Sequence, residues 1–208
     1  MRILVTAGPT REYFDTVRFI SNPSTGKMGY AVAEAAAARG HEVALVSGPV
    51  ELQPPVGVEH VSVVSAEEMF VVCCSLFTEA DAAILTAAVC DYRPARTLNH
   101  KLKKQSRTRR VTLNPTRDIC AHLGSIKGER VVIGFAMEDH NHRAHAEAKL
   151  ARKRCDAIVL NGPGNVGSDE ATVEILTAGG KWSPPVSGSK GRLAVQVIRL
   201  AERLRARQ

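Results

Sequence analysis

The sequence has few aromatic residues, and its cysteines follow no metal-binding pattern. Phe, Trp and Tyr together make up 4% of the 208 residues. Because proteins that bind single-stranded nucleic acid combine basic grooves with aromatic side chains on which bases stack, we expect no nucleic acid partner. The five cysteines, at positions 73, 74, 90, 120 and 155, include no Cys-x-x-Cys pair, which predicts reduced thiols in a cytoplasmic protein.

Signals for secretion, membrane insertion and metal binding are also missing from the sequence. No apolar run is long enough to span a bilayer, and the first residues do not resemble a signal peptide. We therefore expect a cytoplasmic chain with no membrane partner. His140, His142 and His145 lie close together, but no Cys or carboxylate grouping with ligand-like spacing supports a metal site there. We interpret them as a solvated polar face, and metal ligands stay unassigned.

Two common nucleotide-binding motifs are absent. The dinucleotide fingerprint Gly-x-Gly-x-x-Gly should follow its strand directly, but here roughly a dozen residues separate the first strand-like run from the nearest glycine-rich turn. A P-loop needs Ser or Thr after Gly-Lys, whereas Met28 follows Lys27. An ordinary NAD-binding site is disfavoured, and a P-loop is close to excluded.

The most informative stretch that is present runs from Arg18 to Gly29. It lies between an apolar, strand-like run that ends at Ala7 and a small-residue helical pattern that begins at Tyr30. Ser24 or Thr25 can cap that helix, and the glycines at positions 26 and 29 let backbone N–H groups approach a ligand. The pattern predicts a strand-to-helix crossing that can receive an anion.

A phosphate group is the ligand that we expect at this crossing. The net charge of +7, from 28 Lys and Arg against 21 Asp and Glu, favours anionic ligands. A tight turn followed by an ordinary helix cap explains the same residues about as well, so the site stays a hypothesis. Its residues would be Ser24, Gly26, Lys27 and Gly29.

Strand and helix patterns alternate along the chain, which predicts an α/β fold. We expect a Rossmann-like, doubly wound, mostly parallel sheet with a small antiparallel C-terminal extension, in a single domain over residues 1–208. The expected strands are 2–7, 41–46, 58–64, 82–88, 111–113, 131–136, 157–160 and 172–176, and the expected helices are 30–39, 65–78, one beginning near 116–118, 140–154 and 187–207. Residues 8–22 show no period and are expected to form a loop.

A polar, basic segment follows the fourth long strand. Asp91 lies near the carboxyl end of that strand, where open α/β sheets bind their ligands, although a strand-terminating turn explains it equally simply. Residues 92–110 contain Lys101, Lys103 and Lys104 and few apolar residues. We interpret this segment as a mobile basic flap rather than as solvated surface alone.

Six motifs in the same chain carry a resemblance to a known family. They are Thr6-Ala-Gly-Pro-Thr-Arg-Glu, Val17-Arg-Phe-Ile-Ser-Asn, Gly26-Lys-Met-Gly, Ala87-Ala-Val-Cys-Asp-Tyr-Arg-Pro, Lys101-Leu-Lys-Lys and Gly134-Phe-Ala. In this order they resemble phosphopantothenoylcysteine synthetase, the ligase half of the bacterial coenzyme A enzyme. Nothing in the chain resembles the flavin-dependent decarboxylase that often precedes it, so no flavin is expected.

The resemblance implies a two-step ligation in coenzyme A biosynthesis. The carboxylate of 4′-phosphopantothenate attacks the α-phosphate of CTP to give an acyl-cytidylate and pyrophosphate, with Mg²⁺ bound to the nucleotide. The amine of cysteine then displaces CMP and forms the amide. Family members are homodimers, and some use ATP, so the resemblance leaves the choice of nucleotide open.

The resemblance also implies roles for individual residues. Asn22 would stabilise the tetrahedral intermediate, Arg18 would orient the substrate beside Ala88, and Lys101 would act on the nucleotide from the flap. The implied nucleotide contacts are Thr86, Ala87, Asp91, Lys101, Asp118, Ile119, Cys120, Phe135, Lys149 and Lys153.

Several positions depart from the family pattern. Two residues separate Asn114-Pro from Asp118, where the family has none, and unusual residues occupy positions 90, 137–139 and 171. These departures affect nucleotide preference more than the roles of Asn22 and Lys101. Two other classes of function remain: an NAD(P)-dependent oxidoreductase, and a nucleotide-binding module without catalysis.

Overall fold

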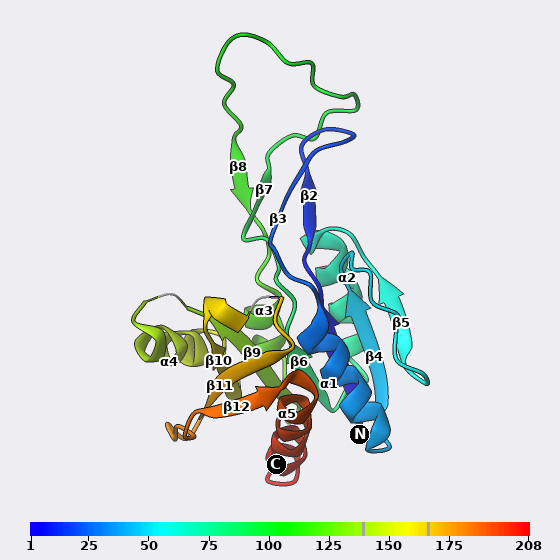
Figure 1. The fold of residues 1–208 in the computed structure, drawn as a ribbon. Coiled ribbons are helices and arrows are strands. Elements are labelled where there is room, and N and C mark those ends of the chain that lie inside the picture. Colours follow the sequence, from blue (N-terminus) through cyan, green and yellow to red (C-terminus); the bar gives the residue numbers. More distant parts are fainter. Residues whose placement is uncertain (139, 166) are drawn as a thin grey trace.

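The computed structural model describes residues 1–138, 140–165 and 167–208, so the departure at Asp139 lies outside the described residues. Eight strands form one sheet (Figure 1). Across the sheet they are β12 (Val186–Ser189), β11 (Glu170–Thr177), β10 (Ala157–Asn161), β9 (Val131–Met137), β6 (Ala82–Leu85), β1 (Arg2–Ala7), β4 (Glu42–Ser47) and β5 (Glu59–Ser62). Neighbouring strands pair in parallel except at β10–β11 and β11–β12, where β11 runs against the others, which confirms the predicted mostly parallel sheet with an antiparallel C-terminal extension.

Helices cover both faces of this sheet. One face carries α1 (Lys27–Ala38) and α5 (Lys190–Arg205), and the other carries α2 (Ala66–Phe77), α3 (Ile119–Ser125) and α4 (His142–Arg152). Successive side chains of β1 point to opposite faces of the sheet, so Ile3 and Val5 pack under α1 while Leu4 packs under α2. Fully burying such side chains stabilises the fold by about 1.5–3 kcal/mol each. No helix in the described ranges is long and apolar enough to cross a membrane.

The order in which the chain adds strands to the sheet reverses at β1, which lies between β4 and β6. The chain runs from β1 through α1 to β4, and it later returns through α2 to β6 on the other side.

The expected strand 82–88 is too long, because β6 ends at Leu85. Thr86 Oγ1 donates to the Thr6 carbonyl at 2.6 Å and Ala87 N–H donates to Thr6 Oγ1 at 3.2 Å, so side-chain hydrogen bonds interrupt the regular ladder there, and backbone pairing resumes at Ala88, whose N–H donates to the Gly8 carbonyl at 2.9 Å.

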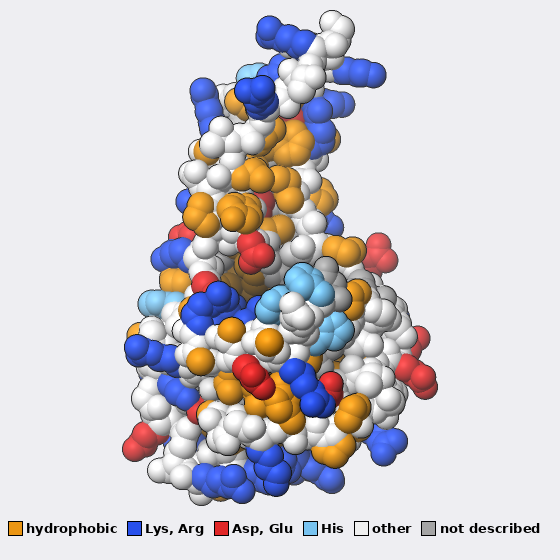
Figure 2. Space-filling model, turned by 90° about the vertical axis from the view of Figure 1, so that its left-hand side faces the viewer, with side chains coloured by type: hydrophobic (Ala, Val, Ile, Leu, Met, Phe, Trp, Pro, Cys, Tyr) orange, Lys and Arg blue, Asp and Glu red, His pale blue; other side chains and the backbone are white. Residues whose placement is uncertain are grey.

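Two short hairpins project beyond the carboxyl ends of the parallel strands (Figure 1). β2 (Arg11–Tyr13) pairs with β3 (Phe19–Ser21), and β7 (Tyr92–Pro94) pairs with β8 (Leu113–Pro115). We call residues 11–21 and 92–115 the arm. Figure 2 shows hydrophobic side chains along the arm and Lys and Arg side chains around its tip.

Two predictions about the residues of the arm were wrong. Residues 8–22 are not only a loop, and strand 111–113 is displaced to 113–115 with an unexpected partner at 92–94. Strands of three residues are too short to show a period in the sequence. The first hairpin is held by side chains, because the Tyr13 and Phe19 rings lie 5.1 Å apart and the Arg11 guanidinium lies 4.7 Å above Phe19.

The start of α1 differs from the expected cap. Gly26, rather than Ser24 or Thr25, is the residue before the helix, and its φ of 77° is a left-handed conformation that favours glycine. Ser24 still contributes, since its hydroxyl accepts a hydrogen bond from the Gly26 N–H at 3.3 Å. The predicted cap of α2 is confirmed, because the Ser65 hydroxyl accepts from the Glu68 N–H at 3.2 Å.

Gly29 allows the first turn of α1 to lie directly against the sheet. A Cβ at this position would lie 2.5 Å from Ala7 Cβ and 2.5 Å from Thr86 Oγ1. Gly29→Ala should therefore overpack this contact and lower the free energy of unfolding by about 1–3 kcal/mol, measured by urea denaturation. Gly191→Ala is the matched control, because nothing lies within 4 Å of its added Cβ in α5. Equal stability of the two variants would contradict this account of the contact.

Candidate functional site

A cavity of about 780 Å³ opens at the carboxyl ends of β1, β6, β9 and β10, below the arm. One side is the turn before α1 and the first residues of that helix. The other side is formed by β9, α4 and the start of α3, and the loop after β6 crosses between them. In open α/β sheets this position, where the strand order reverses, is the usual ligand crevice.

The cavity brings together most of the residues singled out in the sequence. Of the described lining residues, those expected from the sequence are Asn22, Ser24, Gly26, Lys27, Gly29, Thr86, Ala87, Ala88, Asp91, Asp118, Ile119, Cys120, Phe135, Lys149 and Lys153. Arg18 and Lys101 are not among the described lining residues. Both lie on the arm.

The loop that follows β6 is held in place by Asn22. The Asn22 side-chain nitrogen donates to the Ala88 carbonyl at 3.0 Å and to the Val89 carbonyl at 3.2 Å. Both amide hydrogens are thus used to fix the loop. The side-chain oxygen is the atom of this amide that these two bonds leave available to a further partner.

The α1 side of the cavity presents backbone donors. The first N–H groups of a helix have no acceptor within the helix, and at α1 they belong to residues that line the cavity, including Lys27 and Gly29. The partial positive charge of the helix start favours an anion at this place. This geometry is suited to the anion that the sequence predicts at this turn.

Two lysines line the cavity, Lys149 in α4 and Lys153 directly after it, and each is held by a carboxylate. Lys149 Nζ lies 2.5 Å from Glu138 Oε1, and Lys153 Nζ lies 3.1 Å from Asp118 Oδ2. Burial raises the pKa of Glu138, but the hydrogen bond and charge of Lys149 outweigh it, and the pKa is lowered overall. Asp118 also caps α3 by accepting from the Ala121 N–H at 3.0 Å. The two cations are therefore positioned before any ligand arrives.

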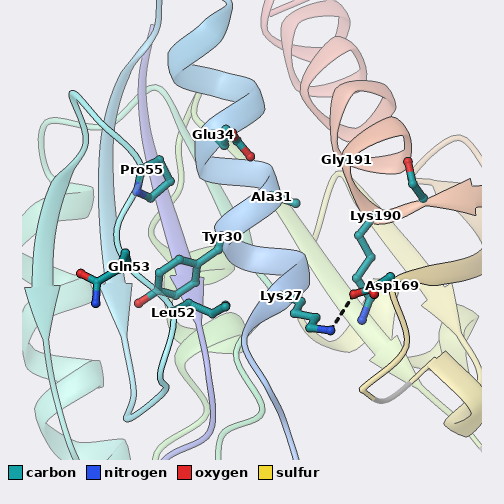
Figure 3. A pocket seen from close by; sticks show the side chains of 11 residues that line it. Lys27, Tyr30, Ala31, Glu34, Leu52, Gln53, Pro55, Asp169, Lys190 and Gly191 are labelled. Carbon is teal, nitrogen blue, oxygen red and sulfur yellow. Dashed lines mark hydrogen bonds and ion pairs between the residues drawn. The ribbon is translucent and has the colours of Figure 1, made fainter.

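A smaller pocket of about 420 Å³ lies on the other side of Lys27, between α1 and the start of α5 (Figure 3). Lys27 Nζ donates to Asp169 Oδ1 at 2.6 Å, and this ion pair lowers the pKa of Asp169. Lys190 lines both cavities and is buried. Burial, with the nearby charge of Lys27, lowers the pKa of Lys190.

Lys190 and Asn161 also line the large cavity, and neither was predicted from the sequence. Asn161 Oδ1 is buried and accepts no hydrogen bond within the described ranges. The sequence did contain a signal for Asn161, because this residue ends a parallel strand, and the same position at a strand end was the reason for selecting Asp91. Lys190 gave no such signal, since it begins an amphipathic helix in which a lysine is ordinary.

Arg18 and Lys101 are brought near each other by Asp15, which is fully buried. The Asp15 carboxylate accepts from the N–H groups of Val17 at 2.8 Å, Arg18 at 2.7 Å and Leu102 at 3.1 Å. The Arg18 guanidinium lies 3.0 Å from Asp15 Oδ2 and also donates to the Leu102 carbonyl. We call this cluster the Asp15 clasp. It holds Leu102, the residue after Lys101, against the first hairpin.

The ionisation of Asp15 depends on these bonds. Burial raises its pKa, but the hydrogen bonds from Arg18, Val17 and Leu102 and the charge of Arg18 lower it to about 2. A depressed carboxylate pKa stabilises the folded state at all pH values above the ordinary value of about 3.9. That contribution is lost progressively as pH falls from there to about 2.

Asp15→Asn should loosen the basic segment at neutral pH. The amide loses the charge and one acceptor oxygen, and an NH₂ group in place of Oδ2 takes that acceptor from both the Leu102 N–H and the Arg18 guanidinium. We expect trypsin to cut between residues 101 and 110 faster than in the native protein, measured by mass spectrometry of early fragments. The exposed carboxylate of Glu34 gives the control Glu34→Gln. Cleavage of all three proteins at one rate would show that the clasp does not hold this segment.

Fold and cavity together define a doubly wound α/β protein with a basic ligand cavity at the switch point of its sheet. The chain belongs to the DNA/pantothenate metabolism flavoprotein C-terminal domain family, whose model matches residues 1–204. This membership confirms the resemblance seen in the motifs.

Curated relatives and a solved structure agree with the family. The coenzyme A biosynthesis bifunctional protein CoaBC of Bacillus subtilis is 46% identical over 160 residues, which cover 76% of this chain and 39% of that protein. The CoaBC of Vibrio vulnificus strain YJ016 is 39% identical over 210 residues, covering 97% of this chain and 52% of that protein. The crystal structure of the C-terminal domain of a CoaBC has 37% identity and a TM-score of 0.84, covering 100% of this chain and 96% of that one.

Proposed function

We propose that the chain is a phosphopantothenate–cysteine ligase domain that works in the cytoplasm through an acyl-cytidylate made from CTP. The chain spans only two-fifths to about half of the curated relatives above, so their whole activity is carried over here as a proposal. The observation that supports it most is the convergence of Asn22, the loop after β6, the turn before α1, Lys149 and Lys153 on one cavity.

The first step joins two anions, the carboxylate of 4′-phosphopantothenate and the α-phosphate of CTP. Two unit charges 4 Å apart repel by about 4 kcal/mol near a protein surface, so the reaction needs cations around the meeting point. Lys27, Lys149 and Lys153 line the cavity and supply them. Their carboxylate partners keep them in place, which is the preorganised electrostatic arrangement that favours a transition state of growing negative charge.

The donor set of the cavity fits a Mg²⁺ ion carried by the nucleotide rather than a resident metal. The described ranges hold no group of three or more Cys, His, Asp or Glu side chains suited to a metal. Mg²⁺ in nucleotide sites is held by one or two carboxylates together with phosphate oxygens and waters, and the Asp91 carboxylate lines the cavity in a position to take part. When bound, Mg²⁺ neutralises charge on the leaving pyrophosphate.

The second step places a tetrahedral centre beside the loop after β6. The Asn22 amide contacts this loop through the Ala88 and Val89 carbonyls. In our proposal the incoming substrate replaces one of these carbonyls as the acceptor of an Asn22 hydrogen bond, and the donated bond stabilises the oxyanion. Because an amide does not titrate, this contact stays the same across the working pH range.

We further propose a homodimer assembled through the arm. The arm exposes large apolar side chains that a monomer would leave in water, with exposed fractions of 52% for Val17, 54% for Tyr92 and 51% for Val111. Phe19 and Leu113 add to the same surface. Exposed apolar patches of this kind mark association sites. A second copy packed there would bring its basic segment, with Lys101, towards a cavity, and closure of that segment would exclude water from the acyl-cytidylate.

The reaction is tested by mixing the protein with CTP, Mg²⁺, 4′-phosphopantothenate and cysteine and measuring pyrophosphate. We expect release that requires CTP and 4′-phosphopantothenate, and amide product only when cysteine is present. Competition between CTP and ATP in the same assay gives the nucleotide preference. Turnover of NAD(P) without pyrophosphate release would support the oxidoreductase class instead, and nucleotide binding without either reaction would indicate a module that does not catalyse.

Lys101→Gln should block the first step and leave the fold unchanged. Loss of one donor to developing charge costs about 100- to 1,000-fold in rate, so if the arm brings Lys101 to the nucleotide as we propose, acyl-cytidylate formation in single-turnover experiments should fall by that factor. Lys181→Gln is the control, since Lys181 is an exposed lysine near β11. If Lys101→Gln makes the acyl-cytidylate at the native rate, Lys101 has no role in activation.

Asn22→Asp should slow the second step more than the first, by about 100-fold. A carboxylate at this position puts a negative charge where the tetrahedral intermediate develops one. The acyl-cytidylate should accumulate without cysteine and persist after cysteine is added, as followed by rapid quench and chromatography. Asn99→Asp, at an exposed site on the arm, controls for the added charge. Equal slowing of both steps would mean that Asn22 only holds the loop.

A further inference from the structure

Two cysteine thiols meet at the wall of the large cavity, and the proposed ligation uses neither of them. Cys120 is the second residue of α3 and lines the cavity. Cys155 lies just before β10 and is only 3% exposed. Their Sγ atoms are 3.3 Å apart. The sulfurs would have to approach by roughly 1.3 Å to reach the bond length of a disulfide, about 2.05 Å.

The sheet below leaves room for this pair of sulfurs. Gly134 in β9 has no side chain, and a Cβ there would lie 3.3 Å from Cys120 Sγ and 3.5 Å from Cys155 Sγ. That Cβ would lie closest to Ile158 Cδ1, at 2.9 Å, so a larger residue would crowd Ile158 and Cys120 Sγ and would touch Cys155 Sγ at ordinary contact distance. The contact between the thiols is therefore built into the packing of α3 and the α4–β10 connection on the sheet.

The charges around the pair make Cys120 the more acidic thiol. The hydrogen bond from Cys155 lowers the pKa of Cys120, burial opposes this, and Lys153 and Lys149 lower it further. The pKa of Cys155 is raised, first by its bond to Cys120 and then by burial. Burial also raises the pKa of Cys74 and Cys90 and takes that of Cys73 to about 12. Cys120 is thus the best thiolate among the five cysteines.

We propose that Cys120 and Cys155 form an oxidation site that hydroperoxides convert to a disulfide. The Cys120 thiolate attacks one peroxide oxygen, the O–O bond breaks, and Cys120 becomes a sulfenic acid while the other oxygen leaves as water or an alcohol. The Cys155 sulfur then attacks the Cys120 sulfur, the S–O bond breaks, and water leaves with the Cys155 proton. Two thiols have lost two electrons, and the peroxide has gained them.

The position of Cys120 connects this site to the ligand cavity. If the cavity holds the nucleotide, which rests on the proposed function, bound CTP covers Cys120 and slows its oxidation. The disulfide would in turn draw the Asp118–Cys120 segment towards Cys155 and change the wall that Asp118 and Lys153 form. We therefore expect the oxidised protein to bind CTP more weakly than the reduced protein.

The test is hydrogen peroxide treatment of the reduced protein, then alkylation of free thiols, digestion and mass spectrometry. We expect a peptide pair linked through Cys120 and Cys155, lost on treatment with dithiothreitol, while Cys73, Cys74 and Cys90 stay alkylated. Free alkylation of Cys120 and Cys155 after peroxide, or a link to another cysteine at equal yield, would overturn the proposal.

Single variants separate the two chemical steps. Cys155→Ser should stop at a Cys120 sulfenic acid that a 1,3-diketone reagent captures, and Cys120→Ser should abolish both products. Cys74→Ser is the matched control and should keep the native link. If Cys155→Ser perturbs folding, Cys155→Ala provides the same readout. A link that forms at the same rate with CTP and Mg²⁺ present would count against nucleotide beside Cys120, and the disulfide itself would still be established by the mapping.

Discussion

The close contact between the first turn of α1 and the sheet is the constraint on which the rest of the site depends. Gly29 permits it, because any side chain there would meet Ala7 and Thr86. The contact places unpaired N–H groups and Lys27 at the switch point of the sheet, and it fixes the turn that carries Asn22. Asn22 in turn holds the loop after β6. The contacts on this side of the cavity therefore depend on one another, and the first of them requires that residue 29 have no Cβ.

The cations on both sides of the cavity depend on balanced charges. Lys27, Lys149 and Lys153 each contact a carboxylate, namely Asp169, Glu138 and Asp118. Such pairs keep cations oriented in a partly buried site without leaving them uncompensated. A polyphosphate ligand competes with these carboxylates for the same ammonium groups, so ligand binding exchanges one set of ion pairs for another. The arm lies outside this exchange, and the Asp15 clasp keeps its basic segment attached to the first hairpin.

The sequence predicted the sheet well because its strands are buried and continuous. β1, β4, β9 and β10 read as apolar runs, and the cap of α2 has an unambiguous Ser65–Glu68 pattern. The arm was missed because three-residue strands show no period, and the cap of α1 was misplaced because a left-handed glycine replaces a side-chain cap. Asp15 and Lys190 could not be predicted, since their roles come from burial against segments distant in the sequence. Family motifs supplied most of the candidate site, and the fold brought most of those residues to one cavity.

The most direct test of the account follows an oxygen atom from substrate to product. 4′-Phosphopantothenate with a heavy oxygen isotope in its carboxylate is converted with CTP, Mg²⁺ and cysteine, and the products are analysed by mass spectrometry. An acyl-cytidylate route transfers one labelled oxygen to CMP and leaves pyrophosphate unlabelled. Label in inorganic phosphate, or CMP without label, would contradict the proposed activation of the carboxylate at the α-phosphate of CTP.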